Sequence, residues 1–129
     1  MTEPIKILLV EDSDFILERL QHQFAQHKEF SIVGYAKTVI DAIQKFDALK
    51  PQIVILDMKL EIGYGLEVLI HIRNKSRECL VVVLTNYSSP SIKNECMELG
   101  ADYFLDKSFE FEQVIEKCKE AIQTLPKFK

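Results

Sequence analysis

Hydrophobic residues follow two spacing patterns that alternate along the chain. Short apolar runs predict five buried strands, and stretches with apolar residues every three or four positions predict five amphipathic helices. The predicted strands are Ile5 to Val10, Ser31 to Ala36, Gln52 to Asp57, Cys79 to Leu84 and Asp102 to Leu105. The predicted helices run from Ser13 to His27, from Thr38 to the residue before Pro51, from Tyr64 to Asn74, from Ser89 to Gly100 and from Glu110 to Thr124. This alternation predicts an α/β fold, a doubly wound five-stranded parallel sheet with helices on both faces.

The third predicted strand carries the first candidate for chemistry. Four apolar residues, three of them β-branched, run directly into Asp57, which predicts a fully buried strand with a carboxylate at its C-terminal edge. Alone, Asp57 is a turn residue as readily as a functional acid. In parallel sheets, however, ligands bind outside the carboxyl ends of the strands. The ends of the other strands therefore have to be compared with it.

Polar side chains also follow three other predicted strands. They are Glu11 and Asp12 after the first, Thr85 after the fourth, and Asp106 and Lys107 after the fifth. A parallel sheet gathers these residues at one edge, where several carboxylates repel one another unless a cation intervenes. Carboxylate oxygens suit Mg²⁺, and a lysine and a hydroxyl beside them can stabilise a phosphoryl group during transfer. In such a site Asp57 is the nucleophile and becomes an aspartyl phosphate.

Each of these features has a simpler explanation when taken alone. Glu11 and Asp12 can cap the following helix as readily as bind a metal. Thr85 can be a cap or loop hydroxyl, and Asp106 with Lys107 can be a solvated pair of little energetic value. Their coincidence at separate strand ends favours the functional interpretation.

Composition narrows the class of protein. The 129 residues suit one domain, 1–129, and the 47% hydrophobic and 28% charged content is ordinary for a globular protein. A net charge of -4 without a basic cluster argues against direct nucleic-acid binding. The absence of a long apolar run or a leader pattern at the N-terminus predicts no membrane association and a cytoplasmic location. Cys79, Cys96 and Cys118 are predicted to be reduced core residues.

Four stretches together resemble the receiver domain of two-component response regulators: ILLVEDSDFI, IVILDMKLEIGYGLEVL, VVVLTN and GADYFLDKS. The resemblance covers essentially the whole chain and implies a flavodoxin-like sheet of order 2-1-3-4-5. It implies that Asp57 is the phosphoacceptor, that Asp12 binds Mg²⁺ directly, and that Glu11 acts through water. The backbone carbonyl of Lys59 is implied as a further metal ligand.

The resemblance also implies how a signal would pass. A sensor histidine kinase or histidine phosphotransfer protein would donate the phosphoryl group, and Thr85 and Lys107 would bind it. Thr85 and Phe104 would then switch position and alter the surface of the fourth helix, fifth strand and fifth helix, which selects a downstream protein. Phe104 as a fixed core residue is the alternative. The chain would act as a signalling receiver that catalyses only its own phosphotransfer and slow autodephosphorylation, as a monomer or a phosphorylation-dependent dimer.

Three residues depart from the family pattern. Ser108 replaces a proline whose preceding bond is commonly cis, and a cis bond before another residue costs about 2.5–4 kcal/mol. A trans bond and a differently aimed Lys107 loop are therefore expected. Glu61 replaces a proline and predicts a looser loop after Asp57. Asn86 replaces a small residue and predicts altered dephosphorylation kinetics.

Two rival functions remain open. A receiver-like scaffold would bind partners without phosphorylation, which the complete set of acids, threonine and lysine disfavours. A phosphohydrolase with an aspartyl nucleophile commonly has a second acid two residues further on, where this chain has Lys59. No output domain is predicted after the last helix, which suits either a single-domain regulator or a receiver from a longer chain.

Overall fold

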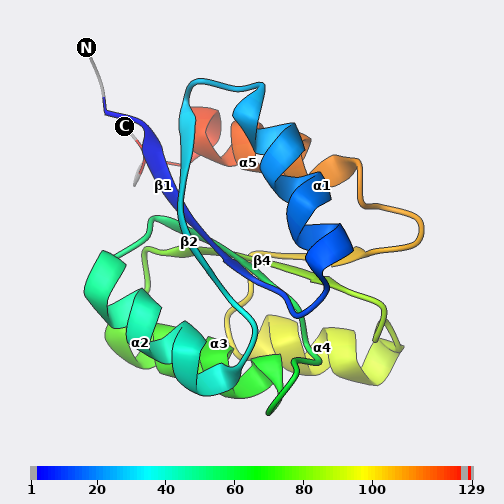
Figure 1. Ribbon diagram of the computed structural model, residues 1–129. Coiled ribbons are helices and arrows are strands. Elements are labelled where there is room, and N and C mark those ends of the chain that lie inside the picture. The colour runs from blue at the N-terminus through cyan, green and yellow to red at the C-terminus, as the bar shows by residue number, and fades with distance from the viewer. Residues whose placement is uncertain (1–2, 126–127, 129) are drawn as a thin grey trace.

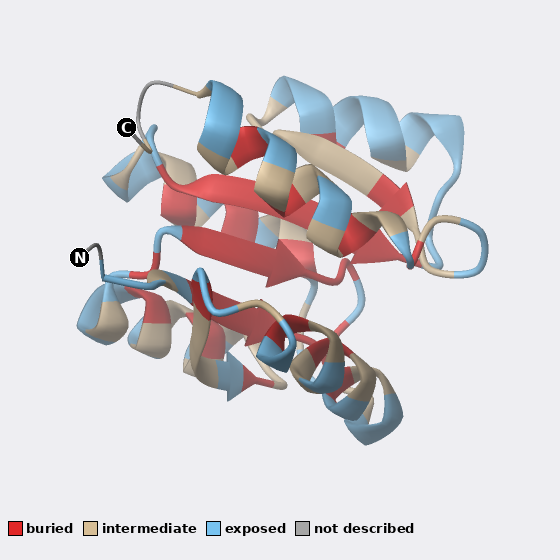
Figure 2. Ribbon diagram, turned by 90° about the horizontal axis from the view of Figure 1, so that it is seen from above, coloured by how far each residue is buried: buried red, intermediate tan, exposed pale blue. Residues whose placement is uncertain are grey.

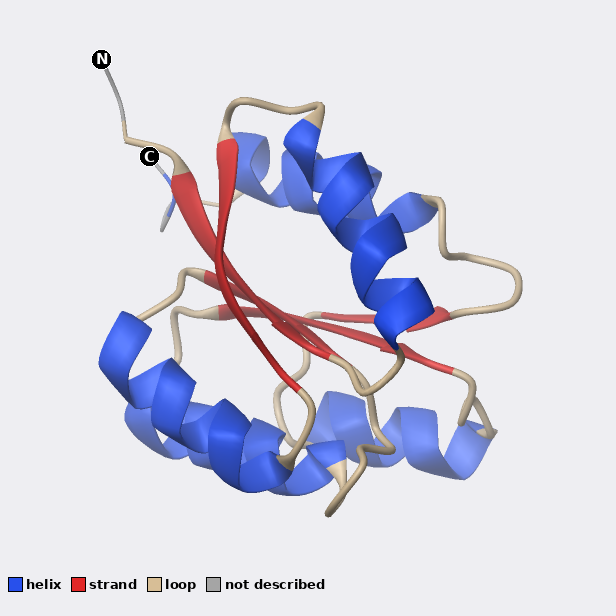
Figure 3. Cartoon of the chain, in the orientation of Figure 1, coloured by secondary structure: helices blue, strands red, loops and turns tan. Residues whose placement is uncertain are grey.

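The computed structural model describes residues 3–125 and 128 as a five-stranded parallel sheet with helices on both faces (Figures 1 and 3). The strands are β1 (Ile5–Val10), β2 (Phe30–Ala36), β3 (Ile53–Leu56), β4 (Leu80–Thr85) and β5 (Tyr103–Asp106). The helices are α1 (Asp14–Ala25), α2 (Val39–Leu49), α3 (Gly65–Lys75), α4 (Pro90–Glu98) and α5 (Gln113–Thr124). The strand order is β2-β1-β3-β4-β5, which confirms the predicted fold class and order.

The core forms two layers, one on each side of the sheet. Helices α1 and α5 cover one face, and α2, α3 and α4 cover the other (Figure 1). Alternate residues of the strands supply the two layers: in β1, Ile7 and Leu9 pack toward α1 and α5, and Leu8 and Val10 pack toward α2 and α3. Strands β3 and β4 are buried along their whole length (Figure 2). This explains why they appear in the sequence as continuous apolar runs.

Short polar side chains begin three of the helices. Ser13, Thr38 and Ser89 accept hydrogen bonds from the backbone N–H groups of Ile16, Asp41 and Ile92. Helix α1 is therefore capped by Ser13, and neither Glu11 nor Asp12 is used as its cap. In the part of the chain that the structure describes, no helix is both long enough and apolar enough to span a membrane.

The predicted start of the last helix at Glu110 is wrong. Residues 107–112 form turns, and α5 begins at Gln113. The backbone N–H of Glu110 donates to the carbonyl of Asp106, and the Glu110 carboxylate accepts from the N–H of Asp106 at 2.9 Å. These bonds hold a separate turn between β5 and α5.

Candidate functional site

Three carboxylates meet at the carboxyl edge of the sheet. Glu11 and Asp12 follow β1, Asp57 follows β3, and one ligand oxygen from each lies within 4.8 Å of the others. Glu11 and Asp57 are 2% and 5% exposed, whereas Asp12 is half-buried and reaches solvent. The backbone fixes this arrangement, because the N–H of Asp57 donates to the carbonyl of Val10 at 2.9 Å.

Lys107 enters the same cluster from the loop after β5. Its Nζ lies 2.6 Å from Oε1 of Glu11 and 2.7 Å from Oδ2 of Asp57. The Lys107 side chain is only 10% exposed. For Lys107, the simpler interpretation as part of a solvated loop pair is therefore wrong.

The cluster keeps a strong attraction for cations despite this lysine. The pKa of Glu11 is raised to about 7, chiefly by burial and also by the charge of Asp57, while the bond from Lys107 opposes this rise. Burial alone would lower the pKa of Lys107, but its bonds to Asp57 and Glu11 outweigh burial and raise it. Lys107 thus stays charged, while three acids share one fixed positive charge.

The acids line a hollow of about 490 Å³ that is open to solvent. Its lining comprises Glu11, Asp12, Ser13, Ile16, Asp57, Lys59, Asn86, Tyr87, Lys107 and Ser108. Hard carboxylate oxygens beside solvent suit Mg²⁺, which retains several of its waters. The residues present therefore fit this ion, with Asp12, Asp57 and Glu11 as the side chains available to hold it. Lys59 lines the hollow, and the ligand role of its backbone carbonyl stays a prediction.

Thr85 lies beside Lys107 at the end of β4. It is fully buried, and its backbone carbonyl accepts from the N–H of Lys107 at 3.1 Å. The Thr85 hydroxyl accepts from the N–H of Tyr87, also at 3.1 Å. The hydroxyl proton stays available for donation to another acceptor.

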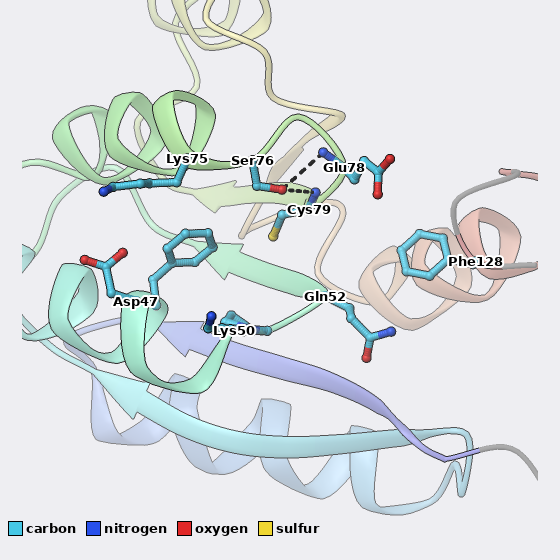
Figure 4. A pocket seen from close by; sticks show the side chains of 10 residues that line it. Asp47, Lys50, Gln52, Lys75, Ser76, Glu78, Cys79 and Phe128 are labelled. Carbon is cyan, nitrogen blue, oxygen red and sulfur yellow. Dashed lines mark hydrogen bonds between the residues drawn. The ribbon is translucent and has the colours of Figure 1, made fainter.

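A larger hollow, of about 680 Å³, lies at the opposite ends of the strands (Figure 4). Its polar side chains include Asp47, Lys50, Lys75 and Glu78, which come from the ends of α2 and α3 and the loops after them. The Ser76 hydroxyl there already accepts from the backbone N–H groups of Glu78 and Cys79. Among the described residues, the only group of three potential metal ligands is the acidic cluster at the other end of the sheet. The chemistry therefore identifies the smaller hollow as the candidate site.

The loop after Asp57 is anchored by its backbone. The N–H of Glu61 donates to the carbonyl of Lys37 at 3.0 Å, and the N–H of Val39 donates to the carbonyl of Ile62 at 3.1 Å. A proline at position 61 would lack the first of these donors. These bonds argue against the looser loop expected from Glu61.

The loop after Lys107 is also fixed by hydrogen bonds. No described peptide bond is cis, so the expected trans bond before Ser108 is confirmed. Lys107 nevertheless reaches both Asp57 and Glu11, so the trans bond does not turn the lysine away. The Ser108 hydroxyl donates to Oδ1 of Asn86 at 3.3 Å, which makes two of the departures from the family pattern partners of each other. The kinetic effect of Asn86 stays a prediction.

Sequence reasoning missed several supporting contacts. The N–H of Ser13 donates to Oε2 of Glu11, and Asp106 accepts from Ser88, Ser108 and Phe109. An aspartate in a loop commonly accepts from the backbone N–H two residues further on, and this turn preference could have identified Asp106. Nothing in the local pattern indicates Ser88.

Phe104 and Tyr103 lie on opposite faces of β5, as the alternation along a strand predicts. Both are half-buried. Phe104 packs against the layer under α2, α3 and α4, and Tyr103 packs against the layer under α1 and α5. The switch role of Phe104 stays a prediction, with a fixed core residue as its alternative.

Comparison with known proteins defines the class. The model of the response regulator receiver domain family matches residues 7–119, and the chain belongs to this family. It is 27% identical over 117 residues to the chemotaxis protein CheY of Listeria monocytogenes, covering 91% of this chain and 98% of that protein. It is also 32% identical to a protein-glutamate methylesterase/protein-glutamine glutaminase of Carboxydothermus hydrogenoformans, of which it spans only 35%. The response regulator domain of Thermotoga maritima CheB superposes with a TM-score of 0.80 at 28% identity, over 93% of this chain and 94% of that one.

The raised pKa of Glu11 predicts a pH-dependent stability in metal-free protein. Glu11 holds a proton more tightly when folded, so its contribution is fully present below its ordinary pKa of 4.5 and is lost as the pH rises through about 7. The free energy of unfolding of Glu11→Gln, relative to that of the wild type, should therefore rise by on the order of 2 kcal/mol between pH 5 and pH 8. Urea unfolding in the presence of a chelator measures this, with Glu61→Gln as a surface control. A constant difference across that range would contradict the assignment.

Proposed function

We propose that the chain is a phosphoacceptor receiver in which Asp57 takes a phosphoryl group from a sensor histidine kinase or a histidine phosphotransfer protein. The observation that carries the proposal is the position of the Asp57 carboxylate, 2.7 Å from the ammonium of Lys107 and within 4.8 Å of two other acids. A bond forms between an Asp57 oxygen and phosphorus as the bond from phosphorus to the donor histidine breaks.

The chain's own residues would orient and neutralise the phosphoryl group. Lys107 would pair with one of its oxygens, and the Thr85 hydroxyl would donate to another. Asp12, Asp57, the carbonyl of Lys59 and, through water, Glu11 would hold Mg²⁺, which when bound neutralises charge on the phosphoryl oxygens. The burial of Glu11 and Asp57 supports this role, because electrostatic interactions strengthen away from water.

The output would be a change of surface. Phosphorylation would draw Thr85 toward the site and favour the inward position of Phe104, so that α4, β5 and α5 select a downstream protein. We assign this receiver role to residues 1–129 as one domain, acting in the cytoplasm as a monomer or a phosphorylation-dependent dimer. It would turn over no separate substrate beyond its own phosphotransfer and slow autodephosphorylation.

The proposal predicts labelling by a small acyl phosphate. With Mg²⁺ present, intact mass should rise by one phosphoryl group, and the label should disappear in Asp57→Asn and under chelation. Asp47→Asn, an acid outside the cluster, serves as the control variant. An unlabelled wild type that still bound its partners would favour a phosphorylation-independent scaffold. Repeated turnover of phosphate esters would favour a phosphohydrolase.

A further inference from the structure

The carboxylate of Asp106 joins the two loops that flank the candidate site. Its Oδ1 accepts from the backbone N–H of Ser108 at 2.7 Å and from that of Phe109 at 3.3 Å. Its Oδ2 accepts from the hydroxyl of Ser88, in the loop between β4 and α4. One side chain therefore closes the turn after Lys107 and fastens that turn to the loop after Thr85.

The backbone of Asp106 is fixed independently of this carboxylate. Asp106 pairs with Thr85 in the sheet, and its N–H donates to the Glu110 carboxylate at 2.9 Å. The next residue, Lys107, donates its own N–H to the carbonyl of Thr85 at 3.1 Å. The carboxylate thus projects from a rigid strand end and can set the path of the residues that follow.

We propose that Asp106 is the positioning residue for Lys107. This inference rests on the proposed function of Asp57 and deepens it. By holding the N–H groups of Ser108 and Phe109, Asp106 fixes the turn after Lys107 without a proline at position 108. The lysine ammonium is thereby kept between Glu11 and Asp57. Through Ser88, the same carboxylate also links the Lys107 loop to the loop after Thr85, so the two phosphate-binding residues share one support.

The pair Ser108 and Asn86 adds a second link between these loops. The Ser108 hydroxyl donates to Asn86 at 3.3 Å, and both residues line the hollow over the acids. Asp106 carries more of the constraint, because it is charged and accepts three hydrogen bonds.

The direct test measures the protection of Lys107 from an amine-acylating reagent, read by peptide mass spectrometry without metal or phosphate. Asp106→Ala should raise the acylation rate of Lys107 several-fold relative to exposed Lys93. Asp106→Asn retains Oδ1 as an acceptor and should stay within about twofold of wild type, since most of the bonds survive. Unchanged protection of Lys107 in Asp106→Ala would overturn the inference.

Two further measurements separate positioning from a general loss of structure. Asp106→Ala should slow phosphorylation by the acyl phosphate about tenfold, since misplacement by about 1 Å can cost up to about a hundredfold. It should also tighten Mg²⁺ binding about threefold, measured by titration and amide NMR, because a competing cation has left the acids. Weakened Mg²⁺ binding with lowered stability would show a merely structural role and overturn the inference.

Failure of the proposed function gives a different pattern. A wild type that takes no label overturns the phosphoacceptor role of Asp57, whereas the acylation of Lys107 still decides the role of Asp106. If the wild type labels normally, and Asp106→Ala labels as fast and protects Lys107 from acylation equally well, only the inference about Asp106 is overturned.

Discussion

Replacing Arg73 with leucine is expected to lower the free energy of unfolding by about 3 kcal/mol, because it breaks a nearly buried charge network. The Arg73 side chain is 15% exposed, and its Nη2 lies 2.9 Å from Oδ2 of Asp102. Three other N–H groups of the guanidinium donate to the backbone carbonyls of Ser76, Cys79 and Gly100 at 3.1, 2.8 and 2.9 Å. Leucine fills part of the space but satisfies none of these acceptors.

Asp102 makes this loss larger than that of a surface ion pair. Its Oδ2 also accepts from the N–H of Val81 at 2.9 Å, so the Arg73–Asp102 pair joins α3 to β4 and to the turn that leads into β5. Without Arg73, the half-buried Asp102 carboxylate keeps the hydrogen bond from Val81 but loses the cation that balances its charge. Urea unfolding monitored by circular dichroism measures the effect. Arg77→Leu is the matched control, because Arg77 is exposed and forms no hydrogen bond or ion pair with the described residues. A similar change in both variants would contradict the role assigned to the Arg73 network.

Much of the site could be predicted because a change from apolar to polar residues marks the end of each buried strand. β3 and β4 are buried on both faces, so their sequences are continuous apolar runs, and the first polar residue after β3 or closing β4 marks the sheet edge. This pattern predicts the positions of Asp57 and Thr85. The strand order came from the resemblance to receiver domains, because hydrophobic pattern alone does not say which strands are neighbours.

The supporting contacts could not be read from the pattern. Arg73 lies on an amphipathic helix, where a long charged side chain normally indicates the solvent face. Its partners Gly100 and Asp102 are 27 and 29 residues away in the sequence. At Cys79 and Gly100 the acceptor is a backbone carbonyl, which carries no sequence signature. The burial of Lys107 was likewise hidden, because a charged pair after a strand is usually solvated and only the folded loop brings the lysine to the acids.

Gly65→Ala is the second substitution with a large expected effect, and it links stability to the site. A Cβ at position 65 would lie 2.0 Å from the carbonyl oxygen of Asp57 and 3.0 Å from Cα of Met58. Both are backbone atoms, so no flexible side chain can move away. The N–H of Gly65 also donates to the carbonyl of Met58 at 2.8 Å, which holds the two segments together. The start of α3 must therefore separate from the residues around Asp57.

We expect Gly65→Ala to lose about 3 kcal/mol of stability, at the upper end for overpacking, and to lose phosphorylation beyond what partial unfolding explains. The second loss follows because the displaced atom belongs to Asp57 itself. Gly34→Ala is the matched control, since the closest atom its Cβ would meet, at 2.9 Å, is the flexible end of the Leu49 side chain. Urea unfolding and acyl phosphate labelling, compared under conditions where each variant is folded, measure the two effects. Equal stability of the two alanine variants would show that the backbone at Asp57 moves at little cost. Lowered stability with normal labelling would show that labelling does not depend on the position of the Asp57 backbone.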